Sequence, residues 1–142
     1  MKDGTRKQKR RIVRVLVMFM LLVYIAGCTL VPPKKERKEA GFVIVTGEYI
    51  PERLTQLIEL KKEQVMKLTY IDGGNRYIVV GYGKQESGGY SIVVKDFYAT
   101  DNALYVDTSL LGPREKPEKE AVASYPYLVL KTTEVGLPVV FQ

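Results

Sequence analysis

The side chains that could perform chemistry in this sequence are carboxylates, lysines, serines, tyrosines and a single thiol. The chain has no His and its only Cys is Cys28, so neither a Ser-His-Asp nor a Cys-His arrangement can form, and the usual zinc and copper sites have no ligand set. What remains is a serine activated by a buried lysine, and the candidates are Ser87, Ser91, Ser109 and Ser124. No motif unites these residues, so the sequence favours a non-catalytic protein, and nothing in it implies a cofactor or a metal.

The thiol of Cys28 is best understood from the residues that precede it. Residues 1–14 carry seven Lys or Arg and one acid, and the run from Val15 to Ile25 contains no charge. A positive head followed by a short apolar run is typical of a secretory signal peptide. The segment Ile25-Ala26-Gly27-Cys28 resembles the bacterial lipobox. This resemblance implies that residues 1–27 are removed as a lipoprotein signal peptide and that Cys28 is lipidated as the mature N-terminus.

The alternative for the leader is an uncleaved membrane anchor. Apolar character extends from Val15 to Val31, a span of 17 residues, at the short limit of the roughly 17–25 residues that cross a bilayer. In either case the rest of the chain lies outside the cytoplasm. We therefore expect the bacterial cytoplasmic membrane as the location, with membrane lipid as a partner through Cys28 and the folded domain on the extracytoplasmic side. The scarcity of Cys suits an oxidising compartment.

Residues 28–41 are predicted to form a solvated tether before a folded domain at residues 42–142. The stretch from Val31 to Gly41 combines two prolines with a run of charges and offers no apolar anchor. The net charge of +6 belongs to the leader, because from Phe42 onward there are 11 basic and 13 acidic residues. A domain without positive charge has nothing to attract phosphates, so nucleic acid is excluded as a partner.

The pattern of apolar residues predicts a mainly β domain with one helix. Pro51 suits the first position of a helix that runs to about Gln64, and Leu54, Leu57 and Ile58 share one face that should pack on the core. Short runs of β-branched and aromatic residues predict the strands. These runs are Phe42–Thr46, Val65–Ile71, Tyr77–Tyr82, Tyr90–Ala99, Ala103–Leu110, Ser124–Lys131 and Val139–Phe141.

Short connections between these runs predict antiparallel neighbours. Asp72-Gly73-Gly74-Asn75 is a strong hairpin turn, and Thr100-Asp101-Asn102 should turn because Asp and Asn tolerate left-handed angles. With the glycine-rich loop Gly83 to Gly89, three successive antiparallel connections predict a meander. The fold class is a small β-sandwich or rolled antiparallel sheet whose open face is covered by the packed helix, after an N-terminal signal or anchor helix.

The candidate recognition element is the loop from Gly83 to Gly89. Gly88 and Gly89 together permit positive φ, so the chain can turn sharply and present main-chain N–H groups. The sequence leaves open whether this loop only closes a scaffold hairpin above Tyr90 or contacts a partner. Tyr82, Tyr125 and Tyr127 could likewise form an interface patch or fill the core. The predicted partner-binding residues are Gly83, Ser87, Gly88, Gly89, Tyr90, Tyr125 and Tyr127.

Several segments, taken in order, resemble the PrcB C-terminal domain family. They are Tyr77-Ile-Val-Val-Gly-Tyr-Gly83, Ser87-Gly-Gly-Tyr-Ser-Ile92, Tyr125-Pro-Tyr127 leading to Lys131, and Pro138-Val-Val-Phe141. That family is named for a lipoprotein subunit of a bacterial cell-surface, subtilisin-like protease complex. The resemblance implies a non-catalytic accessory subunit that helps a secreted protease assemble or become active.

A second resemblance gives the alternative function. The Gly-Gly-Tyr sequence at residues 88–90 is similar to the threonine-glycine-tyrosine loop of chagasin-type cysteine protease inhibitors. In those proteins a glycine-flanked loop on an immunoglobulin-like sandwich enters the protease cleft. Ser87 and Gly88 stand where that motif has threonines or threonine and glycine, so this sequence departs from the inhibitor pattern.

Overall fold

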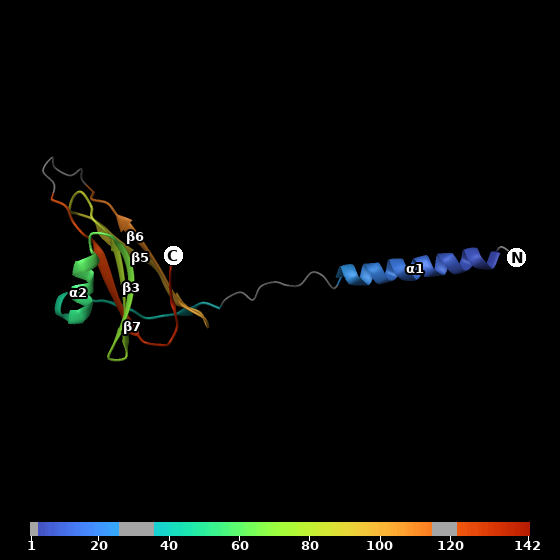
Figure 1. Ribbon diagram of the computed structural model, residues 1–142, viewed down its shortest axis with the longest axis horizontal. Coiled ribbons are helices and arrows are strands. Elements are labelled where there is room, and N and C mark those ends of the chain that lie inside the picture. The colour runs from blue at the N-terminus through green and yellow to red at the C-terminus, as the bar shows by residue number, and fades with distance from the viewer. Residues whose placement is uncertain (1–2, 26–35, 115–121) are drawn as a thin grey trace. The chain divides into compact units, whose positions relative to one another are not determined.

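The computed structural model describes residues 3–25, 36–114 and 122–142 (Figure 1). The chain divides into two units, Met1–Lys34 and Lys35–Gln142. The first unit contains helix α1 (Asp3–Ile25). Within the described ranges, no helix has both the length and the apolar character needed to span a membrane. The predicted lipidation site, Cys28, lies outside the described residues.

The second unit is built from two four-stranded sheets. Sheet A has the order β1-β5-β6-β8, and sheet B has the order β2-β7-β4-β3. Neighbouring strands are antiparallel except β6 and β8, which are parallel. The strands are β1 (Lys38–Glu39), β2 (Val43–Ile44), β3 (Val65–Asp72), β4 (Asn75–Tyr82), β5 (Ser91–Ala99), β6 (Leu104–Leu111), β7 (Tyr127–Thr133) and β8 (Val139–Phe141). This architecture confirms the prediction of a mainly β, sandwich-like fold.

Helix α2 (Glu52–Lys61) covers the outer face of sheet B, after a short 3-10 turn at Gly47–Tyr49 (Figure 1). Leu54 and Ile58 are buried in one cluster with side chains of β3, β4 and β7, as the predicted apolar stripe requires. Leu57, the third member of that stripe, is instead exposed. The helix ends at Lys61, before the predicted end at Gln64.

Alternation along β4 explains how one strand supports two hydrophobic clusters. Ile78 packs between the sheets with Leu104, Val106 and Leu130, whereas Val79 packs on the other face, under α2. Both clusters and all the sheet pairings lie in the unit from Lys35 onward. This unit therefore has the buried interior that it needs to fold by itself.

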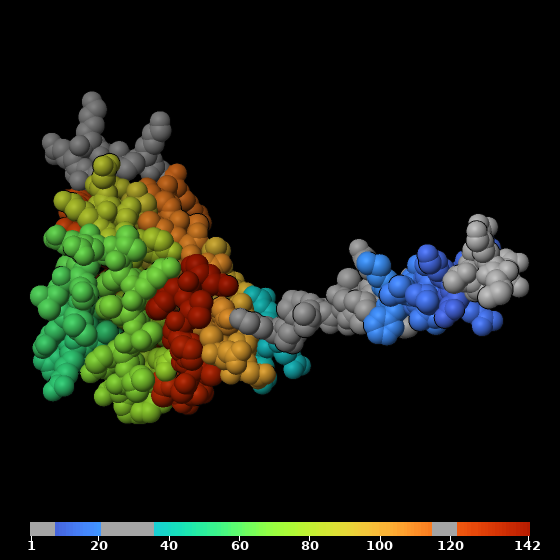
Figure 2. Space-filling view, turned by 45° about the vertical axis from the view of Figure 1, so that its right-hand side comes forward, coloured from blue at the N-terminus to red at the C-terminus, as the bar shows by residue number. Residues whose placement is uncertain are grey.

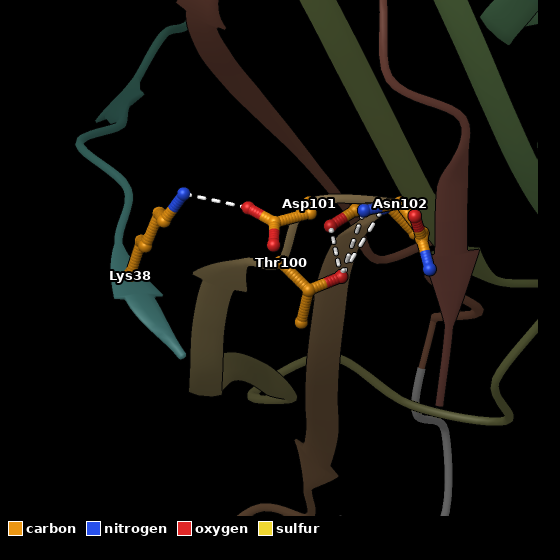
Figure 3. Close-up of polar contacts among 5 residues, drawn as sticks. Lys38, Thr100, Asp101 and Asn102 are labelled. Atoms are coloured by element: carbon orange, nitrogen blue, oxygen red, sulfur yellow. Dashed lines mark hydrogen bonds and ion pairs between the residues drawn. The ribbon is translucent and has the colours of Figure 1, made fainter. Parts of the chain in front are cut away.

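The two predicted tight turns are present, but the second has a different cause. Gly73 and Gly74 both have positive φ in the β3–β4 turn, as a two-residue hairpin requires. In the β5–β6 turn, no residue other than glycine has positive φ in the described parts of the chain, so the prediction of left-handed Asp101 and Asn102 is wrong. The hydroxyl of Thr100 instead accepts hydrogen bonds from the N–H groups of Asn102 (3.3 Å) and Ala103 (3.2 Å) (Figure 3).

The predicted meander is wrong at its central connection. β4 belongs to sheet B and β5 to sheet A, so the glycine-rich loop crosses from one sheet to the other and closes no hairpin. A connection of this length does not force β4 and β5 to be neighbours. Instead β4 pairs with β3 and β7, and β5 pairs with β1 and β6.

The predicted tether also contains structure near its end. Lys38–Glu39 forms β1 and pairs with Tyr98 and Ala99 of β5. Arg37 pairs with Asp96 at 2.5 Å. Figure 3 shows a second ion pair, between Lys38 and Asp101 at 2.6 Å. Residues 36–39 are exposed. The sequence pattern offered no signal for the pairing of Lys38–Glu39 with β5, because the partner residues lie about sixty residues away in the sequence.

Candidate functional site

The predicted recognition residues gather at one end of the sandwich. The register of β4 with β7 places Gly81 beside Tyr127, and the register of β5 with β6 places Ser91 beside Leu111. The connections at this end are therefore α2–β3, β4–β5 and β6–β7, and we call it the loop end. β1 pairs with the last residues of β5, at the opposite end, which we call the entry end.

Gly83 fixes where the loop leaves β4. Its φ is +71°, and a Cβ there would lie 3.1 Å from main-chain atoms of Glu63, Gln64 and Val65. The next residue, Lys84, donates its N–H to the carbonyl of Glu63 at 3.1 Å. Only glycine combines this backbone angle with this close approach, so Gly83 has a structural role.

The middle of the loop is bonded to the segment that precedes β7. Gln85 and Ser124 exchange two main-chain hydrogen bonds, of 2.8 and 3.0 Å. The hydroxyl of Ser124 donates to the carbonyl of Ser87 at 2.5 Å, and the hydroxyl of buried Ser87 donates to the carbonyl of Gly88 at 3.2 Å. Ser87 and Ser124, two of the four serines considered for a Ser-Lys enzyme, therefore donate to main-chain carbonyls. Ser87 is also buried, whereas an inhibitor loop would present it.

Gly88 and Gly89 form the exposed tip of the loop, and they differ from each other. Gly89 has a φ of +83°, and a Cβ there would lie 3.0 Å from the Cβ of Pro113. Gly88 has no positive φ and open space around it, so the prediction that both glycines supply positive φ is wrong for Gly88. Tyr90 is half-buried, with its ring beside Gly112. Part of this ring thus supports the loop, and part remains accessible.

The three tyrosines considered for an aromatic patch divide into two groups. The hydroxyl of Tyr82 lies 2.9 Å from the hydroxyl oxygen of Thr108 and so links sheet B to sheet A. Tyr125 and Tyr127 lie near the C-terminal end of α2 instead, and the Lys62 amine is 5.5 Å from the centre of the Tyr125 ring. Tyr82 is therefore a sheet-to-sheet contact, and only Tyr125 and Tyr127 are available to a surface patch.

Lys62 supplies a cation beside these tyrosines. Its amine pairs with Glu59 at 2.5 Å. This hydrogen bond, with smaller contributions from Glu59 charge and the two tyrosines, holds the pKa of Lys62 above its ordinary value. The sequence analysis missed Lys62 and Pro113 as neighbours of the predicted residues. Each comes from a segment distant in sequence, so spacing gave no signal for them.

One family comparison gives a result for this chain. Residues 76–133 match the family model described as PrcB C-terminal, which confirms the resemblance seen in the sequence. The matched range runs from β4 to β7 and includes the β4–β5 and β6–β7 connections of the loop end. No curated protein and no solved structure matches the chain significantly.

Proposed function

We propose, from the match of residues 76–133 to the PrcB C-terminal family, that this protein is a non-catalytic accessory subunit of a secreted bacterial protease. The family points to a domain associated with a protease complex and so to a protein partner. The finer parts of the proposal are a lipid anchor at Cys28, a domain outside the cytoplasmic membrane, and contact with the protease through the loop end.

The observation that supports contact through the loop end is its placement opposite the entry end. The chain joins the sandwich through β1, next to the β5–β6 turn. The β4–β5 loop and the residues before β7 lie at the other end of both sheets. A domain attached through its N-terminal residues would therefore leave the loop end free for a partner.

The chemistry of the loop end suits a protein surface. Tyr127 is exposed, Tyr125 is half-buried beside Lys62, and Gly88 and Gly89 are exposed. Tyrosine provides a large contact area at a low cost in side-chain entropy, and it is enriched where interfaces are strongest. The bonds from Ser124 and Lys84 hold the loop in one conformation, which limits the entropy lost when a partner binds.

The lipid anchor is tested separately from the partner. Replacing Cys28 with Ser removes the acyl acceptor, so the full-length variant should retain residues 1–27 and carry no lipid. Mass spectrometry of the N-terminal peptide would show a lipidated Cys28 in the wild type and an intact leader in the variant. An unlipidated wild-type chain that keeps its leader would contradict the anchor and favour the uncleaved alternative.

The partner is tested by site-specific photo-cross-linking in the cell that makes the protein. A photoreactive amino acid replaces Tyr127, which is 40% exposed, or Val140 on β8, which is 38% exposed and lies toward the entry end. The proposal expects a cross-link to a secreted protease from position 127 and none from position 140. Loss of the protein should also lower the surface activity of that protease.

Two outcomes would contradict the proposal. Equal cross-linking from both positions would show that the loop end is not selective. Surface protease activity that does not change when the protein is deleted would remove the accessory function.

A further inference from the structure

Strand β3 is a long and regular edge of sheet B. It ends the strand order β2-β7-β4-β3, and its eight residues pair with β4 in continuous register, without a bulge. Among the described residues, β4 is its only neighbour in the sheet. Natural proteins usually protect such an edge with proline, a bulge or charged side chains, lysine above all. Between Val65 and Ile71 the only charge is Lys67, and there is no proline.

The hydrogen-bond pattern shows which residues of β3 have main-chain groups at the free edge. The N–H of Tyr82 donates to Pro126, on the β7 side of β4, at 3.0 Å. In an antiparallel ladder successive residues point to alternate sides, so Tyr82 does not bond its partner Val65. The outward N–H and C=O groups of β3 therefore belong to Val65, Lys67, Thr69 and Ile71.

These four residues are also exposed through their side chains. They lie opposite Tyr82, Val80, Ile78 and Arg76, and so on the face of sheet B that looks toward sheet A. Val65 is 72% and Ile71 57% exposed, and Lys67 and Thr69 are exposed as well. Sheet A therefore stops short of β3. Figure 2 shows this side of the domain, where the green to lime surface of β3 and β4 lies between α2 and the red C-terminal residues.

We propose that the edge of β3 pairs with β3 of a second copy of this chain, antiparallel and centred on Leu68. This register opposes Val65 to Ile71 and Lys67 to Thr69, so residues with outward main-chain groups meet one another, as hydrogen-bonded pairs require. The result is an isologous dimer with two-fold symmetry. Its two copies of sheet B form one continuous sheet.

The side chains are self-complementary in this register. Val65 and Ile71, both exposed in the single copy, cover each other across the dyad. On the α2 side, Met66 lies opposite Tyr70, and Leu68 lies opposite Leu68 of the other copy. All three belong to or pack against the cluster under α2, so the dimer extends that apolar layer. Side chains directly opposite each other on one face of an antiparallel pair contact each other and stabilise the sheet.

The polar residues of β3 agree with the same register. Lys67 meets Thr69, so no like charges lie directly opposite each other, which would destabilise the pair. The Lys67 amine already lies 5.6 Å from the centre of the Phe141 ring in its own chain. At the ends of the strand, Asp72 lies opposite Gln64, whose side-chain amide can donate to the carboxylate.

The first experiment measures the oligomeric state of residues 35–142 by sedimentation velocity over a range of concentrations. The wild-type domain should show a concentration-dependent dimer. Ile71→Lys introduces a charge opposite Val65 and should shift the population to monomer at every concentration. Ile44→Lys is the matched control, because Ile44 lies on β2, the other edge of sheet B, with a similar exposure of 54%. It should dimerise like the wild type.

The second experiment tests the register and does not rely on a loss of binding. Residues 35–142 contain no cysteine, so a single introduced thiol can link only two copies. Leu68→Cys places the two cysteines at a non-hydrogen-bonded pair, whose Cα atoms lie about 4.5 Å apart, within reach of a disulfide. Thr69→Cys is the control, since its two thiols lie on a diagonal about 8 Å apart. Mild oxidation should yield a covalent dimer of the first variant and little of the second.

Three results would overturn the proposal. One is a wild-type domain that stays monomeric at all concentrations, which would leave the β3 edge to an extended segment of a different protein. Another is equal loss of the dimer in Ile71→Lys and Ile44→Lys. The third is cross-linking of Thr69→Cys as fast as Leu68→Cys.

Discussion

Two pairs of neighbouring glycines turn the chain at opposite ends of this domain, and they do so by different means. Gly73 and Gly74 close the β3–β4 hairpin, both with positive φ and both with open space where a Cβ would lie. Gly88 and Gly89 lie in the loop that crosses from sheet B to sheet A. There only Gly89 has positive φ, and its missing Cβ leaves room for Pro113.

The difference follows from the length of each connection. The two-residue turn requires β3 and β4 to be neighbours, so local residues decide the pairing. The β4–β5 loop is longer and imposes no such neighbour. Its shape depends instead on bonds from Ser124 and Glu63, which are distant in sequence. The first turn is therefore a local structure, and the second depends on tertiary contacts.

The largest expected effect comes from comparing Gly83 in the crossing loop with Gly74 in the hairpin turn, both of which have positive φ. Gly83→Ala should lower the free energy of unfolding by about 3 kcal/mol, because a left-handed alanine costs roughly 1–2 kcal/mol and its Cβ would also press on main-chain atoms of residues 63–65. Gly74→Ala, with a similar φ and open space, should cost only about 1 kcal/mol. Urea denaturation of both variants measures the difference. Equal losses would mean that the close approach at Gly83 has no energetic weight.

A smaller effect tests whether the crossing loop depends on its distant hydrogen bond. Ser124→Ala removes the donor to the carbonyl of buried Ser87, and an unsatisfied buried acceptor costs roughly 1–3 kcal/mol. We expect a loss of about 2 kcal/mol and faster hydrogen exchange at Gln85. Ser109→Ala on β6 is the control and should change neither. Unchanged exchange at Gln85 in Ser124→Ala would show that the main-chain pairing alone holds the loop.

The stability of the domain should fall in acid because of an ion pair next to the β3–β4 hairpin. Arg76 is buried and holds both carboxylate oxygens of Glu134, at 2.5 and 2.7 Å, and the N–H of Glu134 donates to the carbonyl of Gly74. The hydrogen bond from Arg76 is the main cause that lowers the pKa of Glu134. A carboxylate with a lowered pKa stabilises the fold above the pKa of an unfolded glutamate, roughly 4.3, and this contribution is lost as the pH falls through the folded pKa.

Thermal unfolding between pH 7 and pH 3 tests this dependence. Glu134→Gln should show a smaller fall in Tm over that range than the wild type, because its side chain cannot titrate. Glu59→Gln is the control, since its partner Lys62 forms an exposed pair at the surface of α2, and such pairs contribute little. If the wild type and Glu134→Gln lose Tm in parallel, the Arg76 pair is not the source of the acid sensitivity.

The elements that sequence predicted well are those set by local patterns. The stripe of Leu54 and Ile58 predicted α2, alternation predicted the main strands, and Gly73-Gly74 predicted the hairpin. The mainly β fold followed from these elements. Local patterns failed for β1, because a charged pair at Lys38–Glu39 becomes a strand only when β5 supplies its partner.

The candidate site was less predictable than the fold, since its contacts join distant segments. The sequence singled out Ser87 and the two glycines, but not the hydrogen bond that Ser124 donates to the carbonyl of Ser87. It grouped Tyr82 with Tyr125 and Tyr127, although Tyr82 points between the sheets to Thr108. The face of the sheet on which a tyrosine side chain lies depends on strand pairing. Because β4 was predicted to pair with the wrong strand, the sequence could not distinguish Tyr82 from Tyr125 and Tyr127.

The smallest expected effect lies within the crossing loop and compares its two adjacent glycines. Gly88→Ala should change the free energy of unfolding by less than about 0.5 kcal/mol, and can increase it, because the site is open and alanine reduces the entropy of the unfolded chain. Gly89→Ala should cost roughly 1–2 kcal/mol, since its φ of +83° is strained for alanine. Chemical denaturation of the two variants in parallel measures the contrast. Similar losses at both positions would mean that the tip requires two flexible residues, as the hairpin turn does, and would remove the distinction between a local turn and one held by distant contacts.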